Sequence, residues 1–309
     1  MTENRIKVGV VGVGYLGRIH AQKYAHIPEA HLVGVVDLDE GSCREVAANT
    51  DCRPFADYRD LVGQVQAVSI AVPTLAHYQI AKAFLQAGID VLVEKPITAT
   101  VREASELNAL ARAEGAIFQV GHLERFNGAL QAVQGVLEDP LLLESFRLAP
   151  FSGRGADVDV ILDLMIHDLD IILSLLEDEV VRVEAVGIPV CTPHIDIAHA
   201  RLVFKRGCAV NITASRVAQE RVRKMTILQK KSYLAVDYLK QSLTITRGKD
   251  LGDERMQVDE IVNVGDSLEQ QLTAFLRSVR ERTNPVVSGE DGQRALELAF
   301  QIADVIKKG

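Results

Sequence analysis

An apolar run that leads straight into three closely spaced glycines constrains the start of this chain more than any other feature. The run covers residues 6–11, and a second apolar run at 32–36 ends on Asp37. The glycines between the two runs are Gly12, Gly14 and Gly17. The order strand, G-x-G-x-x-G, helix, strand and acid is the fingerprint of a βαβ unit that binds a dinucleotide.

Each glycine of the fingerprint has a separate physical role. Gly12 can adopt backbone angles that a Cβ atom would forbid in a tight turn. Gly14 lets the main chain approach a pyrophosphate, and Gly17 lets the helix lie against the sheet. The helix that begins near Tyr15 and Leu16 offers unpaired N–H groups and a partial positive charge, so we expect it to bind the cofactor phosphates.

Asp37 is expected to choose between the two nicotinamide cofactors. It follows Gly17 by 20 residues, where a carboxylate accepts hydrogen bonds from the ribose hydroxyls of adenosine and repels a 2′-phosphate. No Lys or Arg follows it before Arg44. The sequence therefore favours NAD over NADP, although a solvated strand end would also account for an acid here.

Composition limits the classes of partner. The 309 residues are 48% hydrophobic and 25% charged, and the formal net charge is −8, which argues against nucleic acid. No apolar stretch reaches the roughly 18 residues of a membrane span. The N-terminus does not resemble a signal peptide, and the four cysteines form no C-x-x-C pair, so we expect a cytoplasmic protein with reduced thiols.

The first 121 residues alternate strand and helix patterns. Uniformly apolar runs, typical of strands covered on both faces, lie at 7–11, 32–36, 67–72, 91–93 and 117–120. Helical periodicity lies between them at 16–25, 41–48, 75–87 and 101–113. The pattern predicts an α/β fold whose first domain, residues 1–121, is a Rossmann doubly wound parallel sheet.

Residues 122–309 are predicted to form a second, α+β domain that binds substrate, with the last helices free to pack back on the first domain. Helices are expected at 127–137, 157–176, 267–280 and 292–307. Strand-like stretches lie at 141–148, 180–187, 200–204, 209–213, 225–229, 232–237 and 242–246, and Lys205-Arg206-Gly207 predicts a hairpin turn. The mostly antiparallel sheet of about six strands leaves one face open, which predicts a homo-oligomer, a dimer or tetramer.

Polar residues follow the third apolar run of the first domain. Ligands bind outside the carboxyl ends of the strands in an open parallel sheet. Pro73, Thr74 and His77 are therefore expected near the cofactor ribose or nicotinamide. An equally good interpretation makes Thr74 the N-cap of the next helix.

The fourth run delivers Glu94, Lys95 and Pro96 to the same edge. Pro96 fixes the backbone directly after Lys95. An ammonium group at this place can stabilise the negative charge that grows on an alcohol oxygen during oxidation. Lys95 is thus a candidate catalytic residue and, with Glu94, a candidate cofactor contact, although charged residues at strand ends are usually only solvated.

The helix expected over 157–176 is apolar nearly all round but carries a polar stripe. At about 100° per residue, one face collects Asp159, Asp163, His167, Asp170 and Ser174, and only Asp168 departs from it. An imidazole four residues from a carboxylate suits an oriented general base, so Asp163 and His167 are candidate catalytic residues. A structural His–Asp pair is the alternative.

No metal site is predicted. Asp163 and His167 lack a third ligand at a suitable spacing. His194, Asp196 and His199 lie close together in a loop that leads into a strand, and we expect them to be polar surface residues.

Four motifs make the chain similar to a known family. They are Gly12-x-Gly14-x-x-Gly17, Glu94-Lys95-Pro96, Val120-Gly121-His122 with Arg125-Phe126-Asn127, and Asp163-x-x-x-His167-x-x-Asp170. Over nearly its whole length the chain resembles the glucose–fructose oxidoreductase, inositol dehydrogenase and rhizopine-catabolism (Gfo/Idh/MocA) family of NAD(P)-dependent oxidoreductases. The resemblance implies a Rossmann domain followed by an α/β domain whose open sheet forms oligomers. It also places Lys95, Asp163 and His167 in functional positions, whereas Met165 replaces a usual Gly and would narrow the pocket.

Two segments, 121–127 and 162–168, look most like the members that oxidise the 3-position of UDP-N-acetylglucosamine for bacterial lipid A or surface-polysaccharide synthesis. This resemblance implies a sugar or nucleotide-sugar substrate. Candidate contacts for it, besides Asp163 and His167, are His122, Arg125 and Arg154, although solvated roles would serve these three residues as well.

The hypothesis from the sequence is an NAD-dependent dehydrogenase that acts on a secondary alcohol of a sugar. His167 would take the hydroxyl proton as hydride passes to the nicotinamide, Lys95 would stabilise the oxygen, and Asp163 would orient these groups. The rivals are a dinucleotide-sensing regulator without catalysis and a reductase of a polyol, a linear tetrapyrrole or an imine.

Overall fold

The chain is described by a computed structural model that covers residues 5–153, 155, 157–248 and 257–308. It forms two compact units, of which the first is assembled from Met1–Leu123 and Asp266–Gln293. The second unit consists of Glu124–Gly265 and Arg294–Gly309. The chain therefore leaves the first unit, builds most of the second, and returns to the first before it ends in the second.

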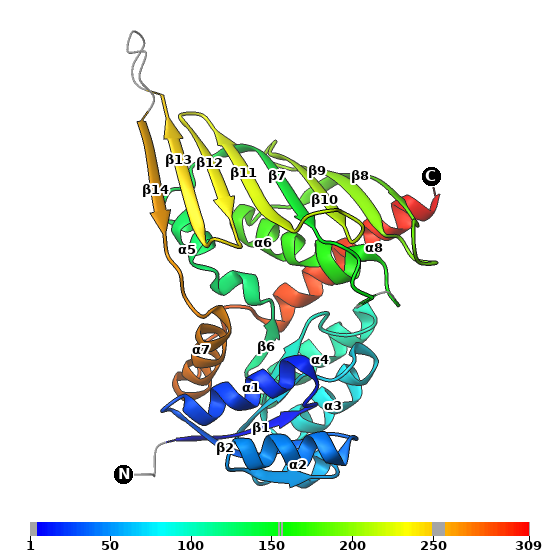
Figure 1. Cartoon of the computed structure of the whole chain (residues 1–309), viewed down its shortest axis with the longest axis vertical. Helices are drawn as coiled ribbons and strands as arrows, with labels where there is room; N and C mark the ends of the chain where they lie inside the picture. Colours follow the sequence, from blue (N-terminus) through cyan, green and yellow to red (C-terminus); the bar gives the residue numbers. More distant parts are fainter. Residues whose placement is uncertain (1–4, 154, 156, 249–256, 309) are drawn as a thin grey trace. The chain divides into compact units, whose positions relative to one another are not determined.

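A six-stranded sheet forms the centre of the first unit (Figure 1). Its order is β3-β2-β1-β4-β5-β6, and every neighbouring pair is parallel, which confirms the predicted doubly wound sheet. The short edge strand β3 is an addition that the apolar pattern does not predict. The strands are β1 (Ile6–Val11), β2 (Ala30–Val36), β3 (Arg53–Phe55), β4 (Ala67–Ile70), β5 (Asp90–Glu94) and β6 (Phe118–Gly121).

The helices of the first unit bury the sheet with their apolar faces. A single core joins β1 and β2 to α1 (Tyr15–His26), α2 (Glu40–Asn49) and α7 (Ser267–Glu281). Elsewhere in the unit, α3 (Thr74–Gln86) packs against α4 (Val101–Glu114) and against β4 and β5. Four residues of α7 belong to the shared core, so a late segment completes the early part of the chain. They are Leu272, Phe275, Leu276 and Val279.

The second unit is built on an eight-stranded sheet with the order β14-β13-β12-β11-β7-β10-β9-β8. All neighbouring pairs are antiparallel except β7 with β10, which confirms a mostly antiparallel sheet but gives it eight strands instead of about six. Gly207 has a φ of 95° in the predicted hairpin turn between β9 and β10. The strands are β7 (Pro140–Leu148), β8 (Val180–Ile188), β9 (Ile197–Phe204), β10 (Ala209–Ser215), β11 (Val222–Gln229), β12 (Ser232–Asp237), β13 (Ser242–Arg247) and β14 (Gln257–Val262).

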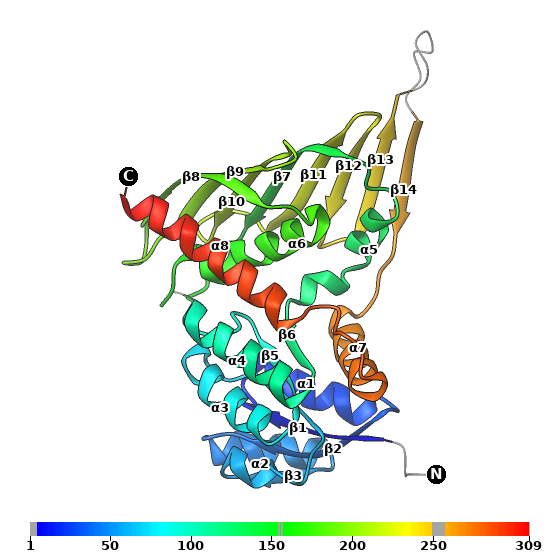
Figure 2. The same cartoon turned by 180° about the vertical axis from the view of Figure 1, so that it is seen from behind.

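Helices lie on one face of this sheet, as the two opposite views show (Figures 1 and 2). They are α5 (Gly128–Gln134), α6 (Ile166–Leu176) and the later part of α8 (Gly289–Lys308). Alternate strand residues such as Val210 and Ile212 join their core. The other face exposes large apolar side chains, among them Phe146, Leu228 and Tyr233.

The helix predicted over 157–176 begins later and less regularly than expected. A π-helical turn covers Ile161–Met165, and only then does α6 start at Ile166. Met165 is fully buried in the hydrophobic core of the unit. The residues before the π turn therefore do not continue the angular spacing of α6.

Candidate active site

The glycine turn after β1 has the geometry that a bound dinucleotide requires. Gly12 has a φ of 86°, and a Cβ atom there would lie 2.7 Å from the backbone oxygen of Ala71. A Cβ atom on Gly17 would lie 1.7 Å from the backbone oxygen of Gly12, so α1 packs directly on the turn. Around Gly14, in contrast, an added Cβ meets no atom within 4 Å among the described residues outside its own chain neighbours. Gly14 is the N-cap of α1 and has no side chain to cap the helix, and the next two residues, Tyr15 and Leu16, are exposed. The open space therefore lies at the helix N-terminus, where a phosphate can bind.

A cavity of about 410 Å³ adjoins this turn. Asp37 lies in its wall and is fixed there, because its Oδ2 accepts a 2.6 Å hydrogen bond from the backbone N–H of Val13. The carboxylate is thus tied to the glycine turn and is more than a solvated strand end. Further lining residues, including the predicted Pro73, are Val11, Gly12, Val36, Leu38, Ala56, Asp57, Tyr58, Arg59, Val72, Ala76 and Ile80.

Tyr58 and Arg59 are lining residues that sequence reasoning missed. They belong to a short 3₁₀ helix, Tyr58–Leu61, and the guanidinium of Arg59 lies 5.5 Å from the centre of the Tyr58 ring. The apolar runs give no signal for them, because a short helix between two strands has no periodicity to detect. They bring an aromatic ring and a cation to the cavity that Asp37 lines.

The segment after β4 differs from the predicted cap of the next helix. Pro73 is the N-cap of α3 and Thr74 its first residue, so the predicted N-cap role of Thr74 is wrong. His77 is buried, with Nδ1 2.9 Å from the backbone oxygen of Pro96 and Nε2 2.9 Å from that of Val72. Its ring thus joins the segments that follow β4 and β5.

Glu94 and Lys95 lie at the end of β5, followed by a cis peptide bond between Lys95 and Pro96. Lys95 is half-buried and Glu94 is buried. Burial raises the pKa of Glu94, but a hydrogen bond from His20 and the charges of His20 and Lys95 outweigh it and hold the pKa below its usual value. Glu94 is therefore a carboxylate at neutral pH, next to the candidate catalytic lysine.

The second unit carries Asp163 and His167 on consecutive helical turns. Asp163 lies in the π turn and His167 at the second position of α6, and both are half-buried. A Cβ atom on Gly155 would lie 2.5 Å from Oδ2 of Asp163, so only glycine lets that loop approach the carboxylate. The Oδ1 atom of Asp159 accepts a 3.0 Å hydrogen bond from the backbone N–H of Ile195, so the first acid of the predicted stripe holds a loop instead.

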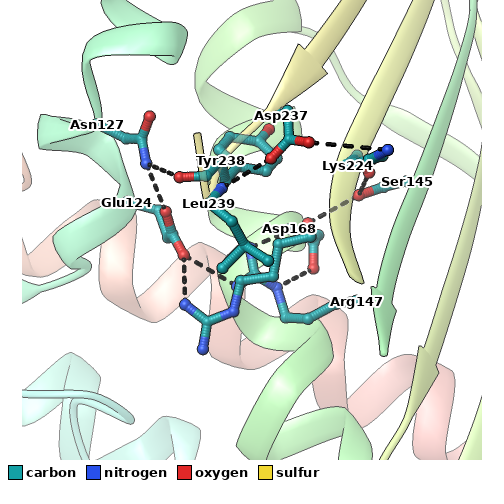
Figure 3. A network of polar contacts seen from close by, with 10 residues as sticks. Glu124, Asn127, Ser145, Arg147, Asp168, Lys224, Asp237, Tyr238 and Leu239 are labelled. Carbon is teal, nitrogen blue, oxygen red and sulfur yellow. Dashed lines mark hydrogen bonds and ion pairs between the residues drawn. The ribbon is translucent and has the colours of Figure 1, made fainter. Parts of the chain in front are cut away.

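Asp168, which departs from the predicted stripe, is the acid with the strongest partners (Figure 3). Its carboxylate is fully buried and lies 2.6 Å from Nε of Arg147 and 2.7 Å from Oγ of Ser145. Arg147 also donates to Glu124 at 3.0 Å. Burial lowers the pKa of Arg147, but the charges of Asp168 and Glu124 raise it well above its usual value. This network ties the turn after His167 to β7 and to the segment that begins at Glu124.

The three candidate substrate contacts outside the helix have different positions. His122 is buried at the end of β6. Arg125 donates a 3.0 Å hydrogen bond from Nε to Asp170, which is buried. Arg154 lies outside the described residues. Asp170 thus serves as the partner of an arginine, which the sequence stripe does not indicate.

The loop with His194, Asp196 and His199 does not form a metal centre. Asp196 is fully buried, which corrects its predicted place at the surface, and accepts backbone hydrogen bonds from Val190, Cys191 and Thr192. Burial raises its pKa, but these hydrogen bonds hold the pKa well below the usual range. Among the residues that the structure describes, no group of three His, Cys, Asp or Glu side chains is arranged to hold a metal ion.

Comparisons with known proteins cover both units. The oxidoreductase family with an NAD-binding Rossmann fold matches residues 6–122, and the Gfo/Idh/MocA C-terminal domain matches residues 127–234. A UDP-N-acetylglucosamine 3-dehydrogenase of Acidithiobacillus ferrooxidans is 39% identical over 303 residues, 96% of each chain. A solved structure of that enzyme from the same organism has a TM-score of 0.92 at 37% identity and covers 98% of both chains. The myo-inositol 2-dehydrogenase of Thermotoga maritima is 25% identical over 316 residues, 96% of this chain and 94% of its own.

No helix in the described part of the chain is both long and apolar enough to span a bilayer. The glycine turn, the fixed Asp37 and the adjoining cavity fit a nicotinamide dinucleotide in the first unit. Together with a relative that is alike over nearly the full length, they identify this chain as an NAD(P)-dependent dehydrogenase that belongs to the Gfo/Idh/MocA oxidoreductase family.

Proposed function

We propose that this enzyme oxidises the 3-hydroxyl of UDP-N-acetylglucosamine with NAD, in the cytoplasm of a bacterium that uses the product for lipid A or surface polysaccharide. The observation that carries the proposal is the 39% identity to a UDP-N-acetylglucosamine 3-dehydrogenase, which extends over 96% of both chains. The four cysteines support the location, because they are free thiols, as in a reducing compartment.

The cofactor would supply a nicotinamide ring that accepts a hydride. Gly12 and Gly14 would let the backbone approach its pyrophosphate, and Asp37 would accept hydrogen bonds from the adenosine ribose. In the proposed reaction, His167 accepts the proton of the sugar hydroxyl. The ammonium of Lys95 stabilises the negative charge on that oxygen, and Asp163 orients the reacting groups.

The test replaces Lys95 and His167 separately by alanine and measures NADH formation from UDP-N-acetylglucosamine. Both variants should lose turnover by about 100-fold or more, the range expected for a group that transfers a proton or stabilises charge. Binding of NADH, followed by fluorescence, should survive in both. As matched controls, Lys82→Ala and His199→Ala change a lysine and a histidine outside the proposed site and should keep turnover.

Wild-type turnover in both Lys95→Ala and His167→Ala would contradict the catalytic roles. Turnover with free polyols but with no UDP-sugar would contradict the substrate. Tight NADH binding without turnover of any of these alcohols would favour a regulator.

The preference for NAD is a separate part of the proposal, supported by the position of Asp37 in the wall of the cavity. Its carboxylate would repel a 2′-phosphate, whereas the guanidinium of Arg59 in the same wall would attract one. Asp37→Ser should therefore raise kcat/KM with NADP and lower it with NAD, and Arg59→Ala added to it should remove the gain. An unchanged ratio in Asp37→Ser would contradict this assignment.

We also propose that the open face of the second unit's sheet joins copies of this chain into a dimer or tetramer. Phe146, Leu228 and Tyr233 lie on the neighbouring strands β7, β11 and β12 and are between 37% and 42% exposed. Large apolar side chains exposed on one face of a sheet favour a protein partner over water. Sedimentation velocity should show an oligomer that Phe146→Glu dissociates, and a monomeric wild type would contradict it.

A further inference from the structure

A buried contact between a histidine and a glutamate links the dinucleotide-binding helix to the strand end that carries Lys95. Nε2 of His20 on α1 lies 3.2 Å from Oε1 of Glu94, the last residue of β5. The side chain of His20 is fully buried and that of Glu94 is 11% exposed. Within the described residues neither ring nitrogen of His20 makes a hydrogen bond of good geometry, so the 3.2 Å approach of Nε2 to Glu94 is the polar contact of this ring. Burying a polar ring with a single polar contact costs free energy of folding, which indicates a role of His20 beyond packing.

Glu94 in turn contacts the backbone of Lys95. Its Oε2 lies 3.4 Å from the backbone nitrogen of Lys95. The carboxylate also lies against Gly121 of β6, where an added Cβ atom would be 2.7 Å from Oε1. The oxygen that faces His20 therefore also lies where only a glycine leaves room for it. A shift of the Glu94 carboxylate would therefore move the backbone of Lys95.

His20 is well placed to transmit the position of the dinucleotide. It lies on α1, whose N-terminus begins at the glycine turn. The helix is further fixed to the sheet by a buried 2.9 Å hydrogen bond between Tyr24 Oη and Ser69 Oγ. The N-terminus of α1 is expected to bind the phosphates, and His20 contacts Glu94 about one and a half turns later. Because the helix is rigid, the phosphates and Glu94 keep a fixed position relative to each other.

We propose that His20 is a positioning residue for Lys95, acting through Glu94, and that it couples phosphate binding at α1 to the alignment of the catalytic ammonium. The proposal rests on the catalytic role proposed for Lys95. In this role His20 presents the N–H of Nε2 to the Glu94 carboxylate, 3.2 Å away, and keeps that carboxylate charged and in place. The carboxylate then holds the backbone of Lys95 and attracts its ammonium group.

The first experiment measures the ionisation of Glu94 without cofactor or substrate. Protein labelled with ¹³C at glutamate carboxyl carbons is titrated by NMR, and Glu94→Gln assigns the signal. In wild-type protein and in His20→Gln, which keeps an N–H donor, Glu94 should stay ionised to the acid limit of the folded protein. In His20→Leu the donor is gone, so the midpoint should rise by at least about one pH unit.

An unmoved Glu94 midpoint in His20→Leu would overturn the proposal. If His20→Leu does not fold, His20→Asn is measured instead, because its amide is one bond shorter and cannot reach Glu94 from the same backbone position. The same rise is expected in that variant, and an unmoved midpoint would again overturn the proposal.

The second experiment measures kcat against pH for NAD-dependent oxidation of UDP-N-acetylglucosamine. His20→Leu should lose on the order of 10- to 100-fold in kcat and shift the acid limb of the profile to higher pH, with NADH affinity near that of the wild type. His20→Gln should rescue both. Adding His20→Leu to Lys95→Ala should cause no further loss, because His20 acts through Lys95.

The outcomes separate the two proposals. Full activity of His20→Leu, combined with an inactive Lys95→Ala, overturns the positioning role and leaves the proposed function intact. An active Lys95→Ala overturns the catalytic role of Lys95 and with it the positioning proposal, while the NMR titration still decides whether His20 controls the charge of Glu94.

Discussion

Two glycines of the same turn should respond in opposite ways to the addition of one methyl group. A Cβ atom on Gly17 would lie 1.7 Å from the backbone oxygen of Gly12, whereas one on Gly14 would meet no described atom within 4 Å outside its own chain neighbours. Restoring van der Waals contact at Gly17 requires α1 to move by roughly 1.5 Å. Overpacking of this kind costs about 1–3 kcal/mol, so Gly17→Ala should lower the free energy of unfolding by that amount.

Gly14→Ala should instead leave stability within about 0.5 kcal/mol of the wild type, as for a surface substitution. Its methyl group occupies the space through which a pyrophosphate would approach the backbone, so NADH binding should weaken by about tenfold or more, equivalent to about 1.4 kcal/mol. Urea denaturation measures the first quantity by linear extrapolation, and a fluorescence titration with NADH measures the second.

Two results of this comparison would contradict the roles assigned to Gly14 and Gly17. Gly14→Ala that is as unstable as Gly17→Ala would show that protein atoms, and not the ligand, require glycine at residue 14. Gly14→Ala that binds NADH as tightly as the wild type would refute the position of the phosphates.

Two further predictions concern buried carboxylates. In the second unit, Asp168→Ala removes the closest partner of the buried Arg147 and should lower the free energy of unfolding by about 3–5 kcal/mol, measured by urea denaturation. The exposed control Glu106→Gln should change that free energy little. Equal effects of the two substitutions would contradict the argument. Asp196 has a pKa that is lower in the folded than in the unfolded protein, so its contribution to stability is present above the unfolded value of about 4 and is lost as the pH falls below it. The difference in unfolding free energy between wild type and Asp196→Asn should therefore stay constant near neutrality and shrink as the pH falls below about 4, and a difference that stays constant at acid pH would contradict the assigned ionisation.

The fold of the first unit could be predicted because burial on both faces makes its strands uniformly apolar. The strands β1, β2, β4, β5 and β6 all follow such runs, and the helices between them have clear periodicity. β3 has three residues, one of them Pro54, at the edge of the sheet, and gives no comparable signal. β14 is an edge strand with Asp259 and Glu260 among mostly exposed residues, so its pattern resembles a loop.

The polar network was less predictable because its members are distant in the sequence or displaced from an ideal helix. The π turn at Ile161–Met165 replaces i→i+4 with i→i+5 spacing, so angles counted at 100° per residue across it misplace Asp159 relative to His167. His20 looks like any polar residue of a surface helix until Glu94, 74 residues later, lies beside it. Only the chain's tertiary contacts distinguish such a histidine from a solvated one.

The return of the chain to the first unit determines how that unit can be made. Until α7 has been synthesised, the apolar surface that receives Phe275 and Leu276 lacks its cover, and β6 lacks the backbone bridge between Gln119 and Ser288. A gene truncated after Leu123 would thus encode a nucleotide-binding fragment with an uncovered hydrophobic side that is prone to aggregation. An independently folding first unit would need residues 266–293 joined directly to that fragment. Cutting the gene at a single point therefore cannot yield this unit in complete form.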